Sequence, residues 1–412
     1  MKKIPYLLFF GIAIACTEPE IIEPIETVEE IETDTTSSEV DTSQVKETNI
    51  WESFGDLDLE NLYNYANQDI PDYITKDNTM DNPVSDKGAT LGRVLFYDKN
   101  LSIDGTVSCS SCHQQAFAFS DPDVASEGVN GTTGRHSMRL INSRFAVEAK
   151  FFWDERAETL EIQTTMPIQD HTEMGFSGEE GNPTLDGLII KMEGIDYYPA
   201  LFAFADGDSS ITEERIQKSL AQFVRSIQSF DSKFDEGRAQ VDADTAPFPN
   251  YSDQENQGKQ LFMAAPVFDN QGVRTGGVGC AGCHAAPEFD IDPNTLNNGH
   301  VSSFTGAQDF TVTRAPSLRD LINPAGEFNG PLMHDGALAD LDAVLDHYNE
   351  IDPAGIENLD RRLTLPPGPG MPPGGVFSLD ITNEEREALK AFLRTLTGSD
   401  VYTNPKWSNP FQ

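Results

Sequence analysis

Two Cys-x-x-Cys-His motifs are the residues of this sequence whose types and spacing point most directly to chemistry. Their members are Cys109, Cys112 and His113 in the first motif and Cys280, Cys283 and His284 in the second. Two thiols on one turn can bond the vinyl groups of a haem, and the adjacent imidazole can bind its iron. Zinc ribbons place their cysteine pairs much closer together, and neither they nor dithiol redox sites require a histidine after both pairs. The sequence therefore predicts two covalent c-type haems.

The one remaining cysteine, Cys16, ends an N-terminal segment that has the layout of an export signal. Two lysines precede an apolar stretch from Tyr6 to Ala15, which ends in small residues. The segment resembles a bacterial lipoprotein signal, which is cut before a cysteine that becomes acylated, although Ala13 stands where leucine is usual. An ordinary secretory signal or a lone buried cysteine is the alternative. We expect residues 1–16 to direct export to the periplasm and Cys16 to carry a lipid anchor to a bacterial membrane.

The acidic composition limits the partners of the chain. The formal net charge is -40 at pH 7, because 68 Asp and Glu residues outnumber 28 Lys and Arg residues. Nucleic acid is not an expected partner, since contacts with phosphate need cations. Small basic redox proteins suit such a surface better, although an acidic surface can also serve solubility alone. Residues 17–50, rich in Glu, Thr, Ser and Asp, are predicted to form an acidic disordered tether.

The elements that must position the motifs are predicted to be helices joined by long loops. Gly88 to Phe96 looks helical and precedes the first motif, and Gln254 to Phe262 precedes the second in the same way. Between them, Ile211 to Phe234 has apolar residues at helical spacings of three and four, with Thr212 as its N-cap. Strand signals are weak throughout. The expected fold class is therefore mainly α.

The C-terminal region contains an irregular segment and a final helix. Leu365 to Gly375 has too many prolines and glycines for regular structure. The helix that follows begins at Thr382, which forms a capping box with Glu385, and Gly398 lies just past its end.

One segment after the first motif, FFWDERAETLEIQTTMPIQDHTEMG from Phe151 to Gly175, resembles the bacterial dihaem cytochrome c peroxidase family, which includes the MauG-type enzymes. The resemblance also covers LGRVLFYDKNLSIDGTVSCSSCH (Leu91–His113), CAGCH, GPLMHDG (Gly330–Gly336) and the last helix, and so extends over most of the mature chain. It implies two cytochrome c-like haem domains with long loops. We expect the first, peroxidatic domain at residues 51–250 and the second, electron-transfer domain at residues 251–412.

Four residues of this segment match functional positions of the family: Trp153, Gln163, Pro167 and Glu173. The resemblance implies that Trp153 moves electrons between the haems and that the Glu173 carboxylate lies over the first iron. Splitting the O–O bond of peroxide needs a proton taken from one oxygen and delivered to the other, which a carboxylate can do. Gln163 would orient peroxide or water, and Pro167 would help to keep a sixth ligand away. Without this context, Trp153 would be interpreted as a core aromatic and the polar residues as solvated surface groups.

The resemblance bears on the distal side of the first haem as well. Many relatives hold a histidine there until the other haem is reduced. The corresponding loop, Asp121 to Arg135, has no histidine, and the nearest is His136, where relatives commonly have asparagine. We therefore expect the first haem to be five-coordinate or water-bound and to need no reductive activation.

The distal ligand of the second haem is the least settled prediction. The resemblance places Tyr348 where relatives carry methionine, or tyrosine in MauG-type enzymes. Methionine raises the potential of a haem, whereas tyrosinate favours ferric and higher oxidation states. The alternative is that Tyr348 packs on the haem edge and Met333 binds the iron; we favour Tyr348.

Calcium is a further metal that the resemblance raises. Relatives bind it between the domains with an asparagine side chain and backbone carbonyls, and the carbonyls map to Asn329 and Pro331 here. His136 occupies the asparagine position, and imidazole is a poor ligand for a hard cation. The sequence leaves calcium open.

Three functions fit these residues. In the leading hypothesis, a peroxidase takes electrons from a small cytochrome c or cupredoxin at the second haem, passes them by Trp153, and reduces hydrogen peroxide to water above His113. The second is a MauG-like oxidase that oxidises residues of a partner protein, which Tyr348 supports. The third is a non-catalytic electron-transfer cytochrome, for which Gln163 and Glu173 would be unnecessary. A homodimer is one assembly compatible with these functions.

Overall fold

A computed structural model of the chain describes residues 51–412, apart from residues 147–149, 270, 272, 292–294, 365–374 and 377. The predicted export signal, the lipidated Cys16 and the acidic tether of residues 17–50 lie outside the described residues. Nearly all of the predicted irregular segment from Leu365 to Gly375 does so too. Within the described ranges, no helix is long and apolar enough to cross a membrane.

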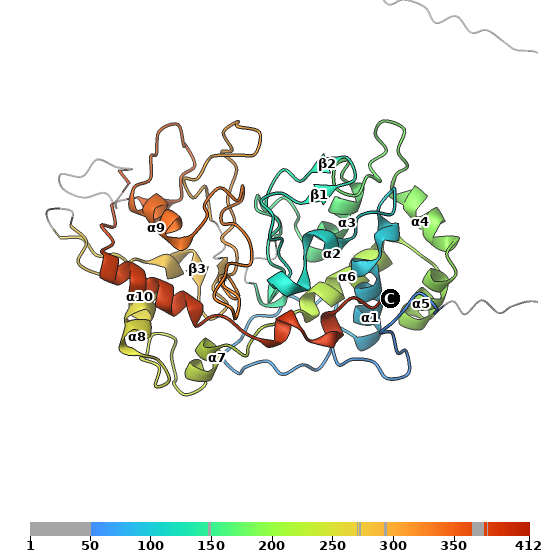
Figure 1. The fold of residues 1–412 in the computed structure, drawn as a ribbon, viewed down its shortest axis with the longest axis horizontal. Coiled ribbons are helices and arrows are strands. Elements are labelled where there is room, and N and C mark those ends of the chain that lie inside the picture. The colour runs from blue at the N-terminus through green and yellow to red at the C-terminus, as the bar shows by residue number, and fades with distance from the viewer. Residues whose placement is uncertain are drawn as a thin grey trace, which may run out of the picture. The chain divides into compact units, whose positions relative to one another are not determined.

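Helices and long loops make up almost all of the described chain, as Figure 1 shows. The α-helices are α1 (Asp86–Tyr97), α2 (Cys109–Cys112), α3 (Leu160–Gln169), α4 (Leu185–Glu193), α5 (Tyr197–Asp206), α6 (Glu213–Ser226), α7 (Lys233–Arg238), α8 (Asp253–Met263), α9 (Leu341–Asn349) and α10 (Asn383–Arg394). Two short antiparallel hairpins pair β1 (Glu127–Gly128) with β2 (Gly131–Thr132) and β3 (His284–Ala285) with β4 (Asp290–Ile291). The prediction of a mainly α fold with long loops is confirmed.

The predicted helix starts are confirmed, but one helix is shorter than predicted. Thr212 caps α6 by accepting from the Arg215 backbone N–H, and Thr382 and Glu385 form the capping box of α10. Helix α6 ends at Ser226 rather than continuing to Phe234. A new helix, α7, begins after Ser232, whose side chain forms a capping box with Asp235. The apolar pattern of the sequence continues past Ser226 because Ile227 and Phe234 are both buried, although the helix has ended.

Two hydrophobic cores divide the helices between them. The first contains apolar residues of α1, α3, α4, α5 and α6, and the second contains residues of α7 to α10. Phe234 and Phe248 belong to the second core, whereas Val401 and Trp407 return the end of the chain to the first. The domain division at residue 250 remains a prediction.

Each core contains a close crossing of two helices that depends on glycine. A Cβ added at Gly92 of α1 would overlap the backbone carbonyl of Ser219 in α6, and one added at Gly258 of α8 would overlap that of Ala388 in α10. Only glycine lets the two backbones approach so closely. The same arrangement thus occurs twice, and in each case the first helix of the pair precedes a Cys-x-x-Cys-His motif.

Candidate active site around the two motifs

The first motif begins with a short helix that presents both thiols and the imidazole. Ser108 and Ser111 form a capping box at the start of α2, and the cysteines are not joined as a disulfide. The Nδ1 of His113 donates to the Phe119 carbonyl over 3.1 Å, and burial lowers the pKa of His113. A neutral imidazole that donates through Nδ1 keeps the Nε2 lone pair for a metal. The first motif therefore fits the proximal side of a haem.

The second motif repeats this arrangement. The Nδ1 of His284 donates to the Pro316 carbonyl over 2.9 Å, and burial lowers the pKa of His284 to about 4. Cys280 and Cys283 are not joined as a disulfide, and burial raises the pKa of Cys280. Strand β3 begins at His284 and holds its backbone against β4. Both histidines are thus prepared for metal binding by a carbonyl on the far side of the ring.

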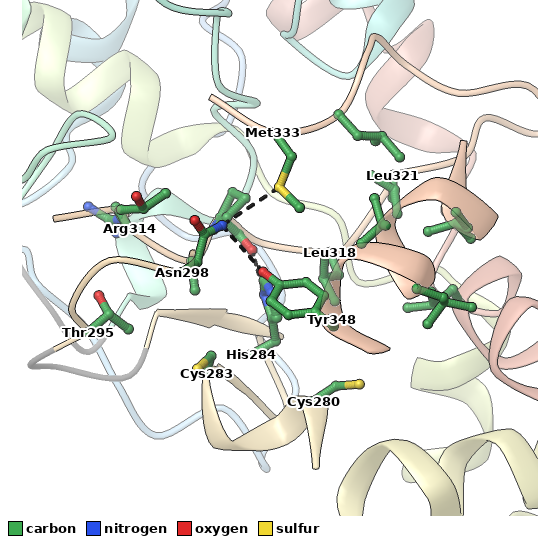
Figure 2. Close-up of a pocket in the computed structure, with 18 of the residues that line it drawn as sticks. Cys280, Cys283, His284, Thr295, Asn298, Arg314, Leu318, Leu321, Met333 and Tyr348 are labelled. Atoms are coloured by element: carbon green, nitrogen blue, oxygen red, sulfur yellow. Dashed lines mark hydrogen bonds between the residues drawn. The ribbon is translucent and has the colours of Figure 1, made fainter. Parts of the chain in front are cut away.

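A cavity of about 210 Å³, partly open to solvent, lies beside the second motif. Cys280, Cys283 and His284 lie together on one side of it in Figure 2. Its walls are largely aliphatic and include Leu318, Leu321, Leu341, Val344, Leu345, Leu389 and Leu393. A large apolar space with two thiols and a neutral imidazole at its edge fits the shape and attachment chemistry of a haem.

Both candidates for the distal ligand of the second haem line this cavity. Figure 2 shows Met333 and Tyr348 above the motif, and the side-chain amide of Asn298 between them. Burial raises the pKa of Tyr348. Asn298 was not among the residues selected from the sequence. Because both Met333 and Tyr348 lie within the same cavity, the ligand remains a prediction.

Trp153 lies in the wall of the same cavity and is held by its own hydrogen bonds. Its side chain is 8% exposed, and its indole N–H donates to the His136 carbonyl over 2.7 Å. Its backbone carbonyl accepts from the Arg314 N–H, also over 2.7 Å. The rings of Trp153 and His334 meet edge to face with centroids 6.3 Å apart. These contacts hold Trp153 in one orientation in the wall of the cavity that the second motif also lines, and its role in electron transfer stays a prediction.

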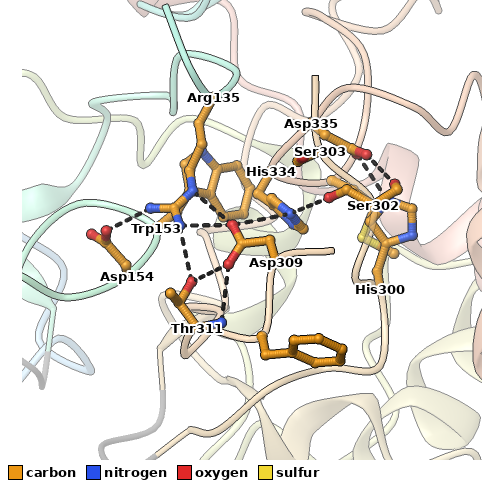
Figure 3. Close-up of polar contacts among 12 residues, drawn as sticks. Arg135, Trp153, Asp154, His300, Ser302, Ser303, Asp309, Thr311, His334 and Asp335 are labelled. Atoms are coloured by element: carbon orange, nitrogen blue, oxygen red, sulfur yellow. Dashed lines mark hydrogen bonds and ion pairs between the residues drawn. The ribbon is translucent and has the colours of Figure 1, made fainter. Parts of the chain in front are cut away.

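An ion-pair network fixes the backbone next to Trp153. Figure 3 shows the Arg135 guanidinium between two carboxylates, at 2.6 Å from Asp154 and 2.7 Å from Asp309. Although burial alone would raise it, hydrogen bonds from Thr311 and Arg135 hold the pKa of Asp309 at about 2. The network joins the segment that carries Trp153 to a loop of the second half of the chain. No local sequence pattern pairs Arg135 with Asp309, and this contact was missed.

Glu173 lies near the first motif in a partly buried position. Burial raises the pKa of Cys109 and Cys112, and the charge of Glu173 adds a smaller contribution in the same direction. Burial, with a smaller contribution from Asp170, raises the pKa of Glu173 to about 7. Such a carboxyl can both accept and release a proton near neutral pH. The role of Glu173 over the first haem stays a prediction.

The backbone at Glu173 is clamped by the β1–β2 hairpin. The Val129 N–H donates to the Glu173 carbonyl over 3.0 Å, and the Asn130 N–H donates to the Thr172 carbonyl over 3.1 Å. Gly128 lies so close that an added Cβ would overlap the Thr172 carbonyl oxygen. Asp170 accepts from the Glu173 N–H on the other side. The position of this carboxyl therefore depends on a glycine in a neighbouring loop.

Gln163 and Pro167 lie in α3, where a spacing of four residues puts them on the same face of the helix. Both are partly exposed. Pro167 has no N–H to donate back to the Gln163 carbonyl. Their contact with a ligand at the first motif remains a prediction.

The predicted calcium position is occupied differently. His136 is buried, its Nδ1 donates to the Asp123 carbonyl over 3.1 Å, and its Nε2 lies 3.0 Å from where a Cβ on Gly330 would stand. Burial lowers its pKa to about 4. The side-chain N–H groups of Asn329 donate to the Asp320 carbonyl and the Tyr402 hydroxyl.

Calcium prefers six to eight oxygen ligands, which an imidazole and two carbonyls do not provide. Among the described residues, no group of three or more His, Cys, Asp or Glu side chains could hold a metal ion. His136 does not suit calcium, whereas the Asn329 side-chain oxygen is buried with no hydrogen-bond partner among the described residues, so calcium at Asn329 and Pro331 stays an open prediction.

Comparison with known proteins points to one family. A family model described as di-haem cytochrome c peroxidase matches residues 86–242. The methylamine utilization protein MauG of Methylorubrum extorquens AM1 is 30% identical over 326 residues, which cover 76% of this chain and 79% of that protein. The cytochrome c551 peroxidase of Nitrosomonas europaea is 25% identical over 323 residues, which cover 75% of this chain and 80% of that protein.

The fold has a matching solved structure as well. A MauG-like protein associated with microbial copper homeostasis superposes with a TM-score of 0.60 at 28% sequence identity. The match covers 84% of this chain and 99% of that one.

Proposed function

The chain belongs to the di-haem cytochrome c peroxidase family, and from this premise we propose that it reduces hydrogen peroxide to water with electrons from a small redox protein. The observation that carries the proposal is the partly buried Glu173 carboxyl, whose backbone is held by the β1–β2 hairpin and whose pKa is raised by burial to about 7. A protein that only transfers electrons has no need of a proton carrier at that position. A peroxidase function therefore explains the Glu173 carboxyl, which a non-catalytic electron-transfer function leaves unexplained.

Two haem c groups are the cofactors that the family implies. Cys109, Cys112 and His113 would hold the first, and Cys280, Cys283 and His284 the second, in two cytochrome c-like domains. When bound, the haems supply iron that exchanges electrons with peroxide and with the donor. The repeated glycine-dependent helix crossing beside each motif supports this pairing of one haem with each core.

Proton transfer is the part of the reaction that this chain's own side chains perform. Reducing peroxide consumes two electrons and two protons and forms two waters. The Glu173 carboxylate would take the proton from one peroxide oxygen and return it to the oxygen that leaves. Gln163 would orient the peroxide, and Pro167, which lacks an N–H, would present only its ring to the site. Trp153, in the wall of the cavity beside the second motif, would carry electrons between the two haem sites.

Steady-state kinetics with hydrogen peroxide and a reduced small basic cytochrome c, or a reduced cupredoxin, tests this function. We expect peroxide-dependent oxidation of two equivalents of donor for each peroxide. We also expect the rate to fall as salt is added, because the chain is strongly acidic. Rapid consumption of peroxide without oxidation of any such donor would contradict the proposal.

A MauG-like oxidase is the second candidate, and the Tyr348 position favours it. In that case two oxidising equivalents from peroxide would be spent on side chains of a partner protein. The donor assay separates the two functions, because such an oxidase would spend the oxidising equivalents on the partner protein rather than on the small donor. Mass spectrometry of proteins from the same cell compartment, treated with the enzyme and peroxide, would detect the modified partner.

We also propose that the protein is exported and anchored to a membrane on the periplasmic side. The signal-like residues 1–16 and the acidic residues 17–50 support this placement, with Cys16 as the lipidated residue. Labelled palmitate should be incorporated into the wild-type protein and not into Cys16→Ala. Export of both variants without labelling would leave an ordinary secretory signal as the explanation.

Replacing Gly128 with alanine should displace Glu173 and lower peroxide turnover, while both haems remain attached. The added methyl group overlaps the Thr172 carbonyl, so residues 172–173 must move away from the hairpin. A misplacement of about 1 Å can cost on the order of 100-fold in rate. Steady-state turnover and haem content per chain are the measurements.

Gly134→Ala is the matched control, since nothing lies within 4 Å of its added Cβ. It should keep wild-type turnover. Equal activity of both variants would show that the hairpin does not position the carboxyl.

Removing calcium should leave turnover unchanged, because the His136 imidazole stands where an oxygen ligand would be needed and its Nδ1 is bonded to the Asp123 carbonyl. Purified protein is treated with a strong calcium chelator and assayed before and after, and its metal content is measured. Loss of activity that added calcium restores would contradict this expectation.

A further inference from the structure

We propose that Asn298 is a positioning residue that selects Tyr348, rather than Met333, as the distal ligand of the second haem. The three side chains meet in the cavity beside the second motif, and Figure 2 shows the Asn298 amide between the two candidate ligands. The inference rests on the proposed function in one respect, namely that a haem is bound at Cys280 and Cys283.

The Asn298 amide nitrogen contacts both candidates. Its Nδ2 lies 3.4 Å from the Tyr348 hydroxyl oxygen and 3.7 Å from the Met333 sulfur. One NH₂ group has two donors, so it can reach an oxygen and a sulfur at the same time. The two side chains that compete for one coordination position therefore share one hydrogen-bond donor.

The orientation of this amide is fixed by the backbone around it. The Asn298 Oδ1 accepts from the His300 N–H over 3.0 Å, which turns the Nδ2 end toward the cavity. The Asn298 carbonyl accepts from the His347 Nε2 over 3.1 Å, and His347 precedes Tyr348 in α9. Gly299 has φ +86, and a Cβ there would come within 2.6 Å of Ile351. The loop thus holds the donor in place relative to the helix that carries Tyr348.

The two acceptors differ in strength. A tyrosine oxygen is a strong hydrogen-bond acceptor, and more so when it carries the negative charge of a metal-bound oxygen. A thioether sulfur is only a weak acceptor. A fixed amide N–H therefore stabilises the arrangement in which Tyr348 is the ligand more than the arrangement in which Met333 is. Met333 is held nearby in the left-handed backbone region, at φ +70, as the alternative ligand.

Spectroscopy of five variants tests this selection. Tyr348→Phe and Met333→Leu provide the reference spectra of the two ligation states. Asn298→Leu removes the donor, and Asn298→Asp removes it while keeping the shape and the acceptor for the His300 N–H. Asn323→Asp is the matched control, because Asn323 holds a turn through its Oδ1 but does not line the cavity. The readouts are the low-spin EPR signal, the near-infrared ligand-to-iron band and the midpoint potential of the second haem.

The wild-type spectrum should change in Tyr348→Phe and persist in Met333→Leu. Both Asn298 variants should shift a measurable fraction of the protein toward the spectrum of Tyr348→Phe, and Asn298→Leu should raise the midpoint potential. Asn323→Asp should match the wild type. The proposal is overturned if the Asn298 variants keep the wild-type spectrum and potential, or if only Met333→Leu alters the wild-type spectrum. Peptide mass spectrometry of Cys280 and Cys283 separately reports whether the haem is attached, and its absence would overturn the proposed function itself.

Discussion

Glu173→Gln is expected to lower peroxide turnover by about 10²- to 10⁴-fold, which is the usual contribution of a general acid–base group. Glutamine keeps the size and shape of the side chain, but its amide cannot take a proton from peroxide or return one. The clamp on the backbone at residue 173 uses main-chain atoms and Asp170, so it survives the substitution. Steady-state turnover with a reduced donor measures the loss, and optical spectra verify that both haems remain attached.

The pH dependence should report the same carboxyl. Burial raises the pKa of Glu173 to about 7, so the carboxylate that accepts the proton predominates above that pH and the protonated form below it. We therefore expect kcat/KM for peroxide to rise with pH through about 7 in the wild type. This limb of the profile should be absent from Glu173→Gln.

Glu179→Gln is the matched control, because it makes the same change at an exposed glutamate of the same segment. It should retain both the rate and the pH profile of the wild type. If Glu173→Gln also retained the wild-type rate and pH profile, Glu173 would not be the proton carrier. A non-catalytic electron-transfer cytochrome would then be the better hypothesis.

Trp153→Phe is expected to lower donor-dependent turnover by about tenfold or more, a change that corresponds to about 1.4 kcal/mol of barrier. The indole lies in the wall of the cavity beside the second motif, and hydrogen bonds of the Trp153 side chain and backbone hold it in place. Phenylalanine is harder to oxidise and is held by fewer contacts. Stopped-flow measurement of electron transfer from the reduced second haem isolates this step.

The substitution also removes a buried hydrogen bond, and Trp407→Phe controls for that loss. Trp407 is 1% exposed, and its indole N–H donates to the Ser226 carbonyl over 3.1 Å. In Trp407→Phe the Ser226 carbonyl still accepts from the Gln68 side-chain amide over 2.8 Å. Each variant removes one buried indole hydrogen bond, so each should lose about 1 kcal/mol of stability. Only Trp153→Phe should slow turnover. A similar loss of turnover in both variants would assign the effect to stability.

The parts of the site that could be predicted from the sequence are those whose residues lie close together in it. The thiols and imidazole of each motif lie on one turn, so their spacing defines the geometry directly. Glu173 and Trp153 belong to one short segment, and Trp153 lines the same cavity as the second motif. Residues that are only a few positions apart in the sequence can adopt only a small range of distances in space, so their relative positions can be predicted.

The parts that could not be predicted depend on contacts between distant loops. Asn298 reaches Tyr348 and Met333 from a loop with no regular structure, and Arg135 pairs with Asp309 across the two halves of the chain. Helix α6 ended earlier than its periodicity indicated, because apolar residues continue into an extended segment that is also buried. Periodicity reports burial on one face, and it does not by itself distinguish a helix from an extended segment that follows it.

We expect the two haem sites to be unequal. The iron bound by His113 should have a free or water-occupied distal position, and the iron bound by His284 should have a protein ligand on both sides. His136, the nearest histidine to the distal loop, is buried with its Nδ1 bonded to the Asp123 carbonyl. EPR of the oxidised protein as isolated tests the claim most directly, since it reports the spin state of each iron. We expect one high-spin and one low-spin haem per chain, in equal amounts. Two low-spin haems, each with two protein ligands, would contradict it.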